Sequence, residues 1–319
     1  MAVETGKMVF EMKGPVRFFF AAVSFCFLFS NCKKEPLTFQ YLFLGHPYDW
    51  KSEGDRIDPR LEKLSLASFD QVWLGGDVCA RLTEKPSTLV YLDSVFHFKK
   101  GNVHWAYGNH DLLYGNREWI EDRTGRPEFY AVSENGVCIA VINTQLFIYP
   151  RVNPPADFCA RLDAQFDFLK TLADTISAPS HLVLLHHYCL MTNGLSGGNL
   201  ELGQFWNFYE PNLQVACTGR GTFEEKIYPL LKKVQQKGVR VILVGGDFGM
   251  RAKTFQYQTA DGIWFLGSGI NNSVGDPATA PEYVTNFDPD KILLFEHRPE
   301  ERALDWKFID LDSLLTSYH

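Results

Sequence analysis

Two stretches of sequence decide the fold of this chain: QVWLGGD at 71–77 and VHWAYGNHD at 103–111. In each stretch a short apolar run reaches glycine and is followed at once by polar residues. Such runs are typical of buried strands, and ligand sites in α/β sheets form beyond the carboxyl ends of strands. We therefore expect the polar residues of both stretches to share one site. They are Asp77, Asn109, His110 and Asp111.

Three further apolar runs, at 39–44, 182–187 and 239–246, have the same character. The polar residues that close or follow them are His46, Asp49, His186, His187 and Asp247. Segments of helical period lie between the runs, at 58–69, 86–99, 157–174 and 222–237. Hairpins are predicted at 129–143 and 255–268, where Asn135-Gly136 and Asp261-Gly262 form the turns. This alternation predicts one α/β domain over 37–319, with sheets that mix parallel and antiparallel pairing.

The order GGD, GNHD, HH and a glycine-rich motif after the last strand resembles the calcineurin-like metallophosphoesterases, over 39 to about 270. The resemblance implies a sandwich of two mixed β-sheets flanked by helices. It also implies site roles. Asp77 would bridge two metals, with Asn109, His186 and Asp247 as further ligands of one of them. His110 would face the scissile phosphate and Asp111 would orient His110.

The first and last motifs depart from the family pattern. His46-Pro47-Tyr48 stands where the family has Asp-x-His, and Gly246-Asp247-Phe248-Gly249 stands where it has Gly-His-x-His. The residues expected at one metal can all ligate: Asp77, Asn109, His186 and Asp247. At the second metal only His46 is an ordinary ligand, since Tyr48 ligates only as phenolate and Gly249 has no side chain. The expected cofactors are divalent ions, Mn, Zn or Fe, with one supported site and a second, weakened one for which Asp49 is an alternative ligand.

The resemblance implies hydrolysis of a phosphomonoester or phosphodiester by a metal-activated hydroxide. The departures leave an alternative open: a degenerate member that binds a phosphorylated or glycan ligand without turnover. Substrates would be phosphorylated small molecules or lipid-linked phosphates. Arg81, Arg117 and Arg251 lie near motif ends and are candidates for phosphate contact, whereas the remaining histidines are assigned to the surface or to packing. They are His97, His104, His181, His297 and His319.

The N-terminus has the layout of a bacterial export signal. Lys13 and Arg17 precede an apolar run at 18–29, which is too short for an ordinary membrane-spanning helix. The run leads to Cys32, which resembles the lipidated cysteine of a lipoprotein. We expect a signal at 1–31, a tether at 32–36, and a protein anchored by lipid in the cell envelope, facing the periplasm or the cell surface, that touches the membrane only through this anchor.

Composition limits the remaining possibilities. The chain has 319 residues, 45% of them hydrophobic and 22% charged, which excludes wholesale disorder. Its net charge of −7 disfavours a nucleic-acid-binding surface. Five cysteines follow the predicted anchor without a CxxC pair, so most are expected to be buried, with room for one disulfide. The long segment 188–221 breaks the alternation of strands and helices and is predicted to be a lid.

Overall fold

The computed structural model describes residues 37–147, 156–206, 217, 219–271 and 274–317. The predicted signal, tether and Cys32 lie outside these residues, as does His319. The described residues from Leu37 onward belong to one compact unit. In the described part of the chain, no helix has both the length and the apolar character needed to cross a membrane.

The first sheet has five strands in the order β11-β10-β1-β2-β3. The strands are β1 (Phe39–Leu44), β2 (Gln71–Leu74), β3 (Val103–Trp105), β10 (Lys291–Arg298) and β11 (Ala303–Asp310). Strands β1, β2 and β3 are parallel, while β10 and β11 join antiparallel. Parallel pairing puts the carboxyl ends of the first three strands at one edge, where Gly45, Gly75 and Gly108 follow them.

The second sheet has six strands in the order β4-β5-β6-β7-β9-β8. The strands are β4 (Tyr130–Glu134), β5 (Val137–Val141), β6 (His181–His186), β7 (Arg240–Gly245), β8 (Thr254–Gln258) and β9 (Trp264–Ser268). The four central strands are parallel and the two edge strands are antiparallel, because the predicted hairpins form. Two mixed sheets flanked by helices confirm the predicted fold class.

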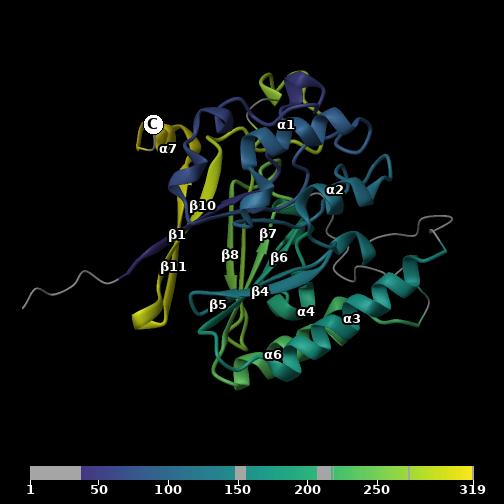
Figure 1. The fold of residues 1–319 in the computed structure, drawn as a ribbon, viewed down its shortest axis with the longest axis vertical. Coiled ribbons are helices and arrows are strands. Elements are labelled where there is room, and N and C mark those ends of the chain that lie inside the picture. The colour runs from purple at the N-terminus through teal and green to yellow at the C-terminus, as the bar shows by residue number, and fades with distance from the viewer. Residues whose placement is uncertain (1–36, 148–155, 207–216, 218, 272–273, 318–319) are drawn as a thin grey trace, which may run out of the picture. The chain divides into compact units, whose positions relative to one another are not determined.

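Helices cover the outer faces of both sheets (Figure 1). Those of the described residues are α1 (Pro86–Phe96), α2 (Arg117–Thr124), α3 (Phe158–Thr175), α4 (Asn193–Ser196), α5 (Phe223–Lys226), α6 (Tyr228–Gln236) and α7 (Leu311–Ser317). Helices α3 and α6 pack side by side on the second sheet. Helices α1 and α2 pack on the first sheet.

Side-chain alternation along the strands builds three apolar layers. In β1, Tyr41 and Phe43 face the layer between the sheets, whereas Leu42 and Leu44 face the helices. The layer between the sheets also contains Trp73, Ile139, Val183, Val244, Leu293 and Phe295. Because both faces of the central strands are buried, these strands read in sequence as continuous apolar runs.

Two of the predicted helices differ from expectation. The segment 58–69 forms only two short 3-10 turns, Leu61–Lys63 and Leu66–Ser68. The segment 222–237 divides into α5 and α6, with Ile227 between them and Pro229 in the first turn of α6. Proline lacks the amide hydrogen that would continue the first helix into the second.

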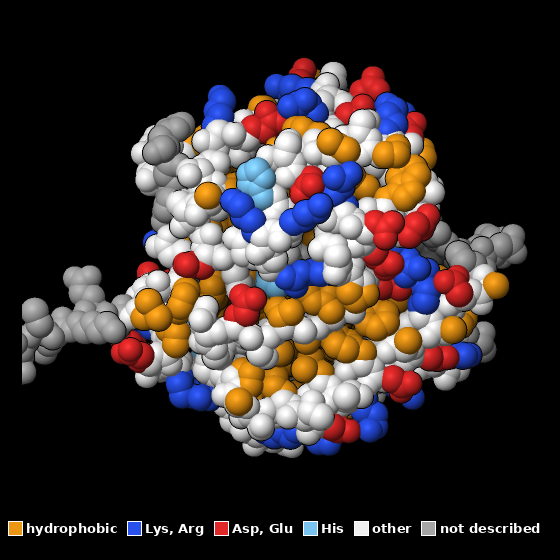
Figure 2. Space-filling model, in the orientation of Figure 1, with side chains coloured by type: hydrophobic (Ala, Val, Ile, Leu, Met, Phe, Trp, Pro, Cys, Tyr) orange, Lys and Arg blue, Asp and Glu red, His pale blue; other side chains and the backbone are white. Residues whose placement is uncertain are grey.

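One disulfide joins Cys159 of α3 to Cys217 in the long segment after β6. Cys79, Cys138 and Cys189 are free and buried. Of the predicted lid, residues 207–216 and 218 lie outside the described residues, so its role as a lid stays a prediction. On the face shown in Figure 2, basic and acidic side chains are interspersed.

Candidate active site

Glycines let the two sheets meet at the carboxyl ends of their strands. A Cβ on Gly75, after β2, would lie 2.7 Å from Cα of Gly246, after β7. A Cβ on Gly246 would in turn lie 2.0 Å from the carbonyl oxygen of Gly75. Neither position accepts a side chain, and this contact brings the polar residues of both sheets to one place.

Asp77 is at the centre of the site and is 1% exposed. Its Oδ1 accepts a hydrogen bond of 2.8 Å from the backbone N–H of His110. Its Oδ2 lies 3.5 Å from Nε2 of His46 and 3.5 Å from Nε2 of His187. Asp77 and His46 both adopt left-handed φ angles, +52° and +51°. Non-glycine residues in this region cost free energy, and such strain gathers at functional sites.

The structure places His187, and not the predicted His186, beside Asp77. His186 has the strand parity of Leu182 and Leu184, so it faces the helix-covered side, and its Nδ1 donates to the carbonyl of Tyr188 at 2.7 Å. His187, with the opposite parity, reaches Asp77. Period-two alternation along the strand was the signal in the sequence that distinguishes the two histidines.

Hydrogen bonding defines the tautomer of His187. Its Nδ1 lies 2.8 Å from the carbonyl oxygen of Gly75, which can only accept, so Nδ1 carries the proton. Burial lowers the pKa of His187, which favours the neutral ring. Its Nε2 lone pair therefore points at oxygens: Asp77 Oδ2 and, with the amide oriented as assigned, Asn109 Oδ1 at 3.3 Å.

Asp111 has a different role from the predicted orientation of His110. Its carboxylate accepts hydrogen bonds from the backbone N–H groups of Asp77, Val78 and Gly108 at 2.8–2.9 Å, and from the indole of Trp105 at 3.1 Å. It therefore holds the two loops after β2 and β3 together. No hydrogen bond joins it to the ring of His110 among the described residues, so the predicted orienting role is wrong.

The clustered side chains line a cavity of about 320 Å³. Its lining residues are His46, Tyr48, Asp77, Asn109, His110, Asp247, Met250, Arg251 and Tyr283. Nδ1 of His110 and Oδ2 of Asp247 are buried and make no hydrogen bond with any described residue. Burial raises the pKa of Asp247 to about 6, with the Asp77 carboxylate as a smaller cause in the same direction. Burial also raises the pKa of Asp77 itself.

At the positions expected for a second metal only His46 is an ordinary ligand, and its Nε2 lies 3.5 Å from Asp77 Oδ2. Gly249 has a φ of +99°, and a Cβ there would lie 2.7 Å from the carbonyl carbon of Gly269. Burial, and then the charge of Asp77, raise the pKa of Tyr48 far above its usual range, which disfavours the phenolate that could ligate. We call His46, Tyr48 and Gly249 the aromatic side, and Asp77, Asn109, His187 and Asp247 the carboxylate side.

Of the arginines predicted to contact phosphate, and of the alternative ligand Asp49, only Arg251 lines the cavity. Arg251 lines the cavity and also donates to the carbonyl of Gly203 at 2.8 Å. Arg81 and Arg117 instead pair with glutamates outside it. Asp49 accepts from the N–H of Lys51 as the cap of a 3-10 turn and is not among the lining residues. Sequence reasoning missed His187, Met250 and Tyr283.

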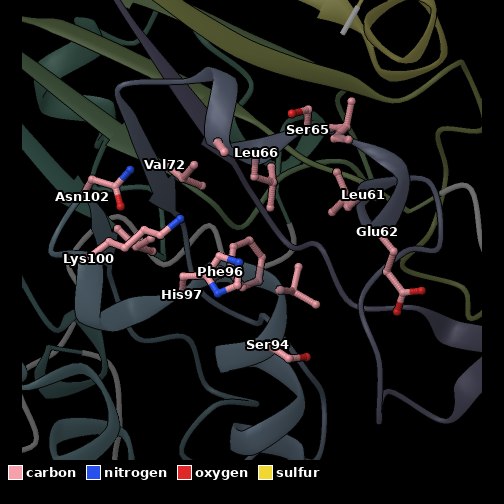
Figure 3. A pocket seen from close by; sticks show the side chains of 14 residues that line it. Leu61, Glu62, Ser65, Leu66, Val72, Ser94, Phe96, His97, Lys100 and Asn102 are labelled. Atoms are coloured by element: carbon pink, nitrogen blue, oxygen red, sulfur yellow. The ribbon is translucent and has the colours of Figure 1, made fainter. Parts of the chain in front are cut away.

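A second cavity, of about 280 Å³, lies between the turns at 61–68 and the end of α1 (Figure 3). Its walls are mostly apolar. Lys100 and Asn102 stand on the opposite side of it from Glu62. None of the residues predicted for catalysis or metal binding lines it.

The carboxylate side fits a divalent cation in part. Ligands at 2.0–2.1 Å from a tetrahedral ion are about 3.4 Å apart, which matches the 3.3 and 3.5 Å separations around Nε2 of His187. Within the described ranges, however, no three His, Cys, Asp or Glu side chains form a group able to hold a metal ion. The amide of Asn109 is thus a necessary donor beside Asp77 and His187.

Comparison with known proteins supports the fold. No protein-family model matches the sequence, and no curated protein is significantly similar to it. A dimetal phosphatase from Danio rerio is structurally similar, with a TM-score of 0.50 and 11% identity over 87% of this chain and 100% of that one.

Phosphopantetheinyl hydrolase from Mycobacterium tuberculosis has a TM-score of 0.38, with 15% identity over 76% of this chain and 98% of that one. Vps29 from Chaetomium thermophilum has a TM-score of 0.32, with 12% identity over 85% of this chain and 97% of that one. The fold assignment rests on the Danio rerio structure and on the strand order described above. The chain has the fold of the calcineurin-like metallophosphoesterases.

Proposed function

We propose that this chain hydrolyses a phosphate ester in the cavity beside Asp77, with one divalent cation held by Asp77, Asn109 and His187. The observation that carries the proposal is the Nε2 lone pair of His187, which faces oxygen acceptors at 3.3 and 3.5 Å. A lone pair opposed to oxygens is unfavourable unless a cation lies between them. The backbone hydrogen bond on the other ring nitrogen is the usual support of a metal-ligating histidine.

A cation in this place would supply Lewis-acid polarisation of the phosphoryl group and an activated water. The protein's own residues do the rest. Asp111 fixes the backbone of both ligand loops, and Asp247 adds a buried carboxylate beside the same donors. His110 lines the cavity and is placed to protonate the leaving oxygen. Mn, Zn or Fe suits such a mixed nitrogen and oxygen donor set.

The substrate class we propose is a phosphomonoester or phosphodiester of a small molecule or of a lipid-linked phosphate. The Danio rerio protein of similar fold is described as a dimetal phosphatase, which supports this reaction class. The present chain differs in its aromatic side, where Gly249 offers no ligand. That difference favours a second candidate function, in which the site binds a phosphorylated ligand without turnover.

Metal loading and turnover together test the proposal. The purified chain is stripped with chelator, dialysed against Mn²⁺, Zn²⁺, Fe²⁺ or Co²⁺, and analysed by inductively coupled plasma mass spectrometry. Hydrolysis of aryl phosphate monoesters and diesters is then measured. We expect one ion per chain and turnover that depends on it. A chain that binds the ion and phosphate without turnover is the second candidate, and a chain that binds neither contradicts both.

We propose in addition that the protein is exported and lipid-anchored through Cys32. The disulfide between Cys159 and Cys217 supports this, because disulfides persist in oxidising compartments. A Cys32→Ala variant should leave the membrane fraction of the expressing bacterium. If it stays with the membranes as the natural chain does, the anchor is wrong.

A further inference from the structure

The aromatic side carries two polar groups that the proposed function leaves unused, the hydroxyl of Tyr48 and the ring of His46. Tyr48 follows β1 and is 4% exposed. Its ring centroid lies 4.5 Å from that of His46, 5.2 Å from that of Trp50 and 5.6 Å from that of His110. A backbone bridge to Ile57 holds the same residue from the other side. These contacts leave the side chain little freedom to rotate.

The Tyr48 hydroxyl makes no hydrogen bond with any described residue, although the side chain is almost fully buried. Tyr48 lines the cavity, and the charges of Asp77 and Asp247 act on its hydroxyl. Because no described residue bonds this hydroxyl and it stays accessible from the cavity, a group that enters the cavity can accept a hydrogen bond from it. Phosphoryl oxygens are strong acceptors of this kind.

Gly249, the position of the last motif expected at the same metal as Tyr48, cannot donate such a hydrogen bond from a side chain. Gly249 packs against Gly269, so this position itself cannot present a side chain to the cavity. On the aromatic side the remaining donors among the lining residues are the Tyr48 hydroxyl and the ring of His46. A neutral phenol is a hydrogen-bond donor over the whole ordinary pH range, which makes it a permanent donor toward a bound phosphoryl group.

We propose that Tyr48 is a catalytic residue that donates a hydrogen bond to a phosphoryl oxygen of the substrate, in a site that holds one cation per chain. The inference rests on the proposed function and deepens it. The donor faces charge that grows on the phosphoryl oxygens in the transition state. A hydrogen bond aimed at such charge contributes more to the rate than to ground-state binding.

Tyr48→Phe removes the hydroxyl and keeps the ring, so the packing against His46 and Trp50 is preserved. Tyr41→Phe is the matched control, because Tyr41 is also a buried tyrosine and belongs to β1. Its hydroxyl lies 2.8 Å from Nδ1 of His297, and Tyr41 does not line the cavity. Ion content, affinity for inorganic phosphate by calorimetry, and kcat on an aryl phosphate are measured for the natural chain and both variants. Thermal melting confirms that each is folded.

We expect one ion per chain in all three proteins. Tyr48→Phe should weaken phosphate affinity up to about tenfold and lower kcat about 10²-fold, while Tyr41→Phe should change neither. Equal phosphate affinity and kcat in Tyr48→Phe would overturn the inference and leave the proposed function standing. Two ions in the natural chain and one in Tyr48→Phe would also overturn it, because Tyr48 would then be a metal ligand. A natural chain that binds no ion and no phosphate contradicts the proposed function itself.

Discussion

The carboxylate side and the aromatic side of the site differ in their chemistry. On the carboxylate side, a deprotonated ring nitrogen of His187 meets the oxygens of Asp77 and Asn109. On the aromatic side, Tyr48 lines the cavity with a phenol whose pKa is raised by burial, and Gly249 has no room for a side chain. The first side is suited to a cation and the second to a phosphoryl oxygen. The comparison teaches that neighbouring motifs of one fold can present different donors, carboxylate, amide and imidazole groups in one place and a phenol beside the same cavity in another.

The largest effect is expected from Asp77→Asn, since this residue has the central carboxylate. An amide keeps an oxygen for the N–H of His110 but removes the charge that would hold the cation. We expect turnover to fall by at least about 10³-fold, with melting temperature little changed. Steady-state kinetics on an aryl phosphate checks this. Unchanged activity would mean that the reaction does not depend on the carboxylate side.

Gly249→Ala tests whether the aromatic side is closed. A Cβ at this position overlaps Gly269 and lies in a left-handed backbone, so we expect a loss of about 2–5 kcal/mol in the free energy of unfolding. The matched control is Gly238→Ala, because Gly238 has a φ of +82° and no atom within 4 Å of an added Cβ. It should lose less, since only backbone strain applies. Equal losses in urea unfolding would show that Gly249 is not closely packed.

The neighbouring histidines of β6 allow a matched pair of variants. His187→Ala should lower affinity for the cation by more than about 100-fold, because it removes a ligand rather than a supporting residue. His186→Ala should keep cation affinity and lose about 1–3 kcal/mol of stability through the lost bond to Tyr188. Calorimetric titration with Mn²⁺ or Zn²⁺ distinguishes them. The reverse pattern would restore His186 as the ligand.

The smallest effect concerns pH. Burial raises the pKa of Asp247 to about 6, so this carboxyl becomes neutral below that pH. Cation affinity should therefore fall as pH drops from 7 to 5, by about tenfold over the whole interval. Asp247→Asn should bind more weakly at pH 7 and show a shallower decline. If both proteins decline with the same slope, Asp247 does not take part in binding the cation.

Most of the fold could be predicted because its strands are buried on both faces. The runs at 39–44 and 239–246 are apolar except for Gln40 and Arg240, and glycines mark where each ends. The two hairpins could be predicted from their turn residues, Asn135-Gly136 and Asp261-Gly262. The helix predicted at 58–69 failed, because its apolar residues pack against the first sheet from 3-10 turns instead. Periodicity alone does not distinguish these cases.

Site residues were found where a motif has polar side chains directly after a strand. Asp77, Asn109, His110 and Asp247 all line the cavity. His186 was chosen over His187 because the choice followed motif order rather than strand parity. The resemblance implies that Asp111 orients His110, whereas the Asp111 carboxylate accepts hydrogen bonds from the backbone of the Asp77 loop.

The sequence by itself determined the strands, the turns and the kinds of donor available, because these depend on local preferences and on alternation. The tertiary structure alone decided which donors meet. The contact between Gly75 and Gly246 joins two sheets, and residues about 170 positions apart in the chain become neighbours through it. Tertiary packing also closed the space beside Gly249 and buried most of the Tyr48 side chain. Such facts depend on what fills the volume around a residue, which no local pattern encodes.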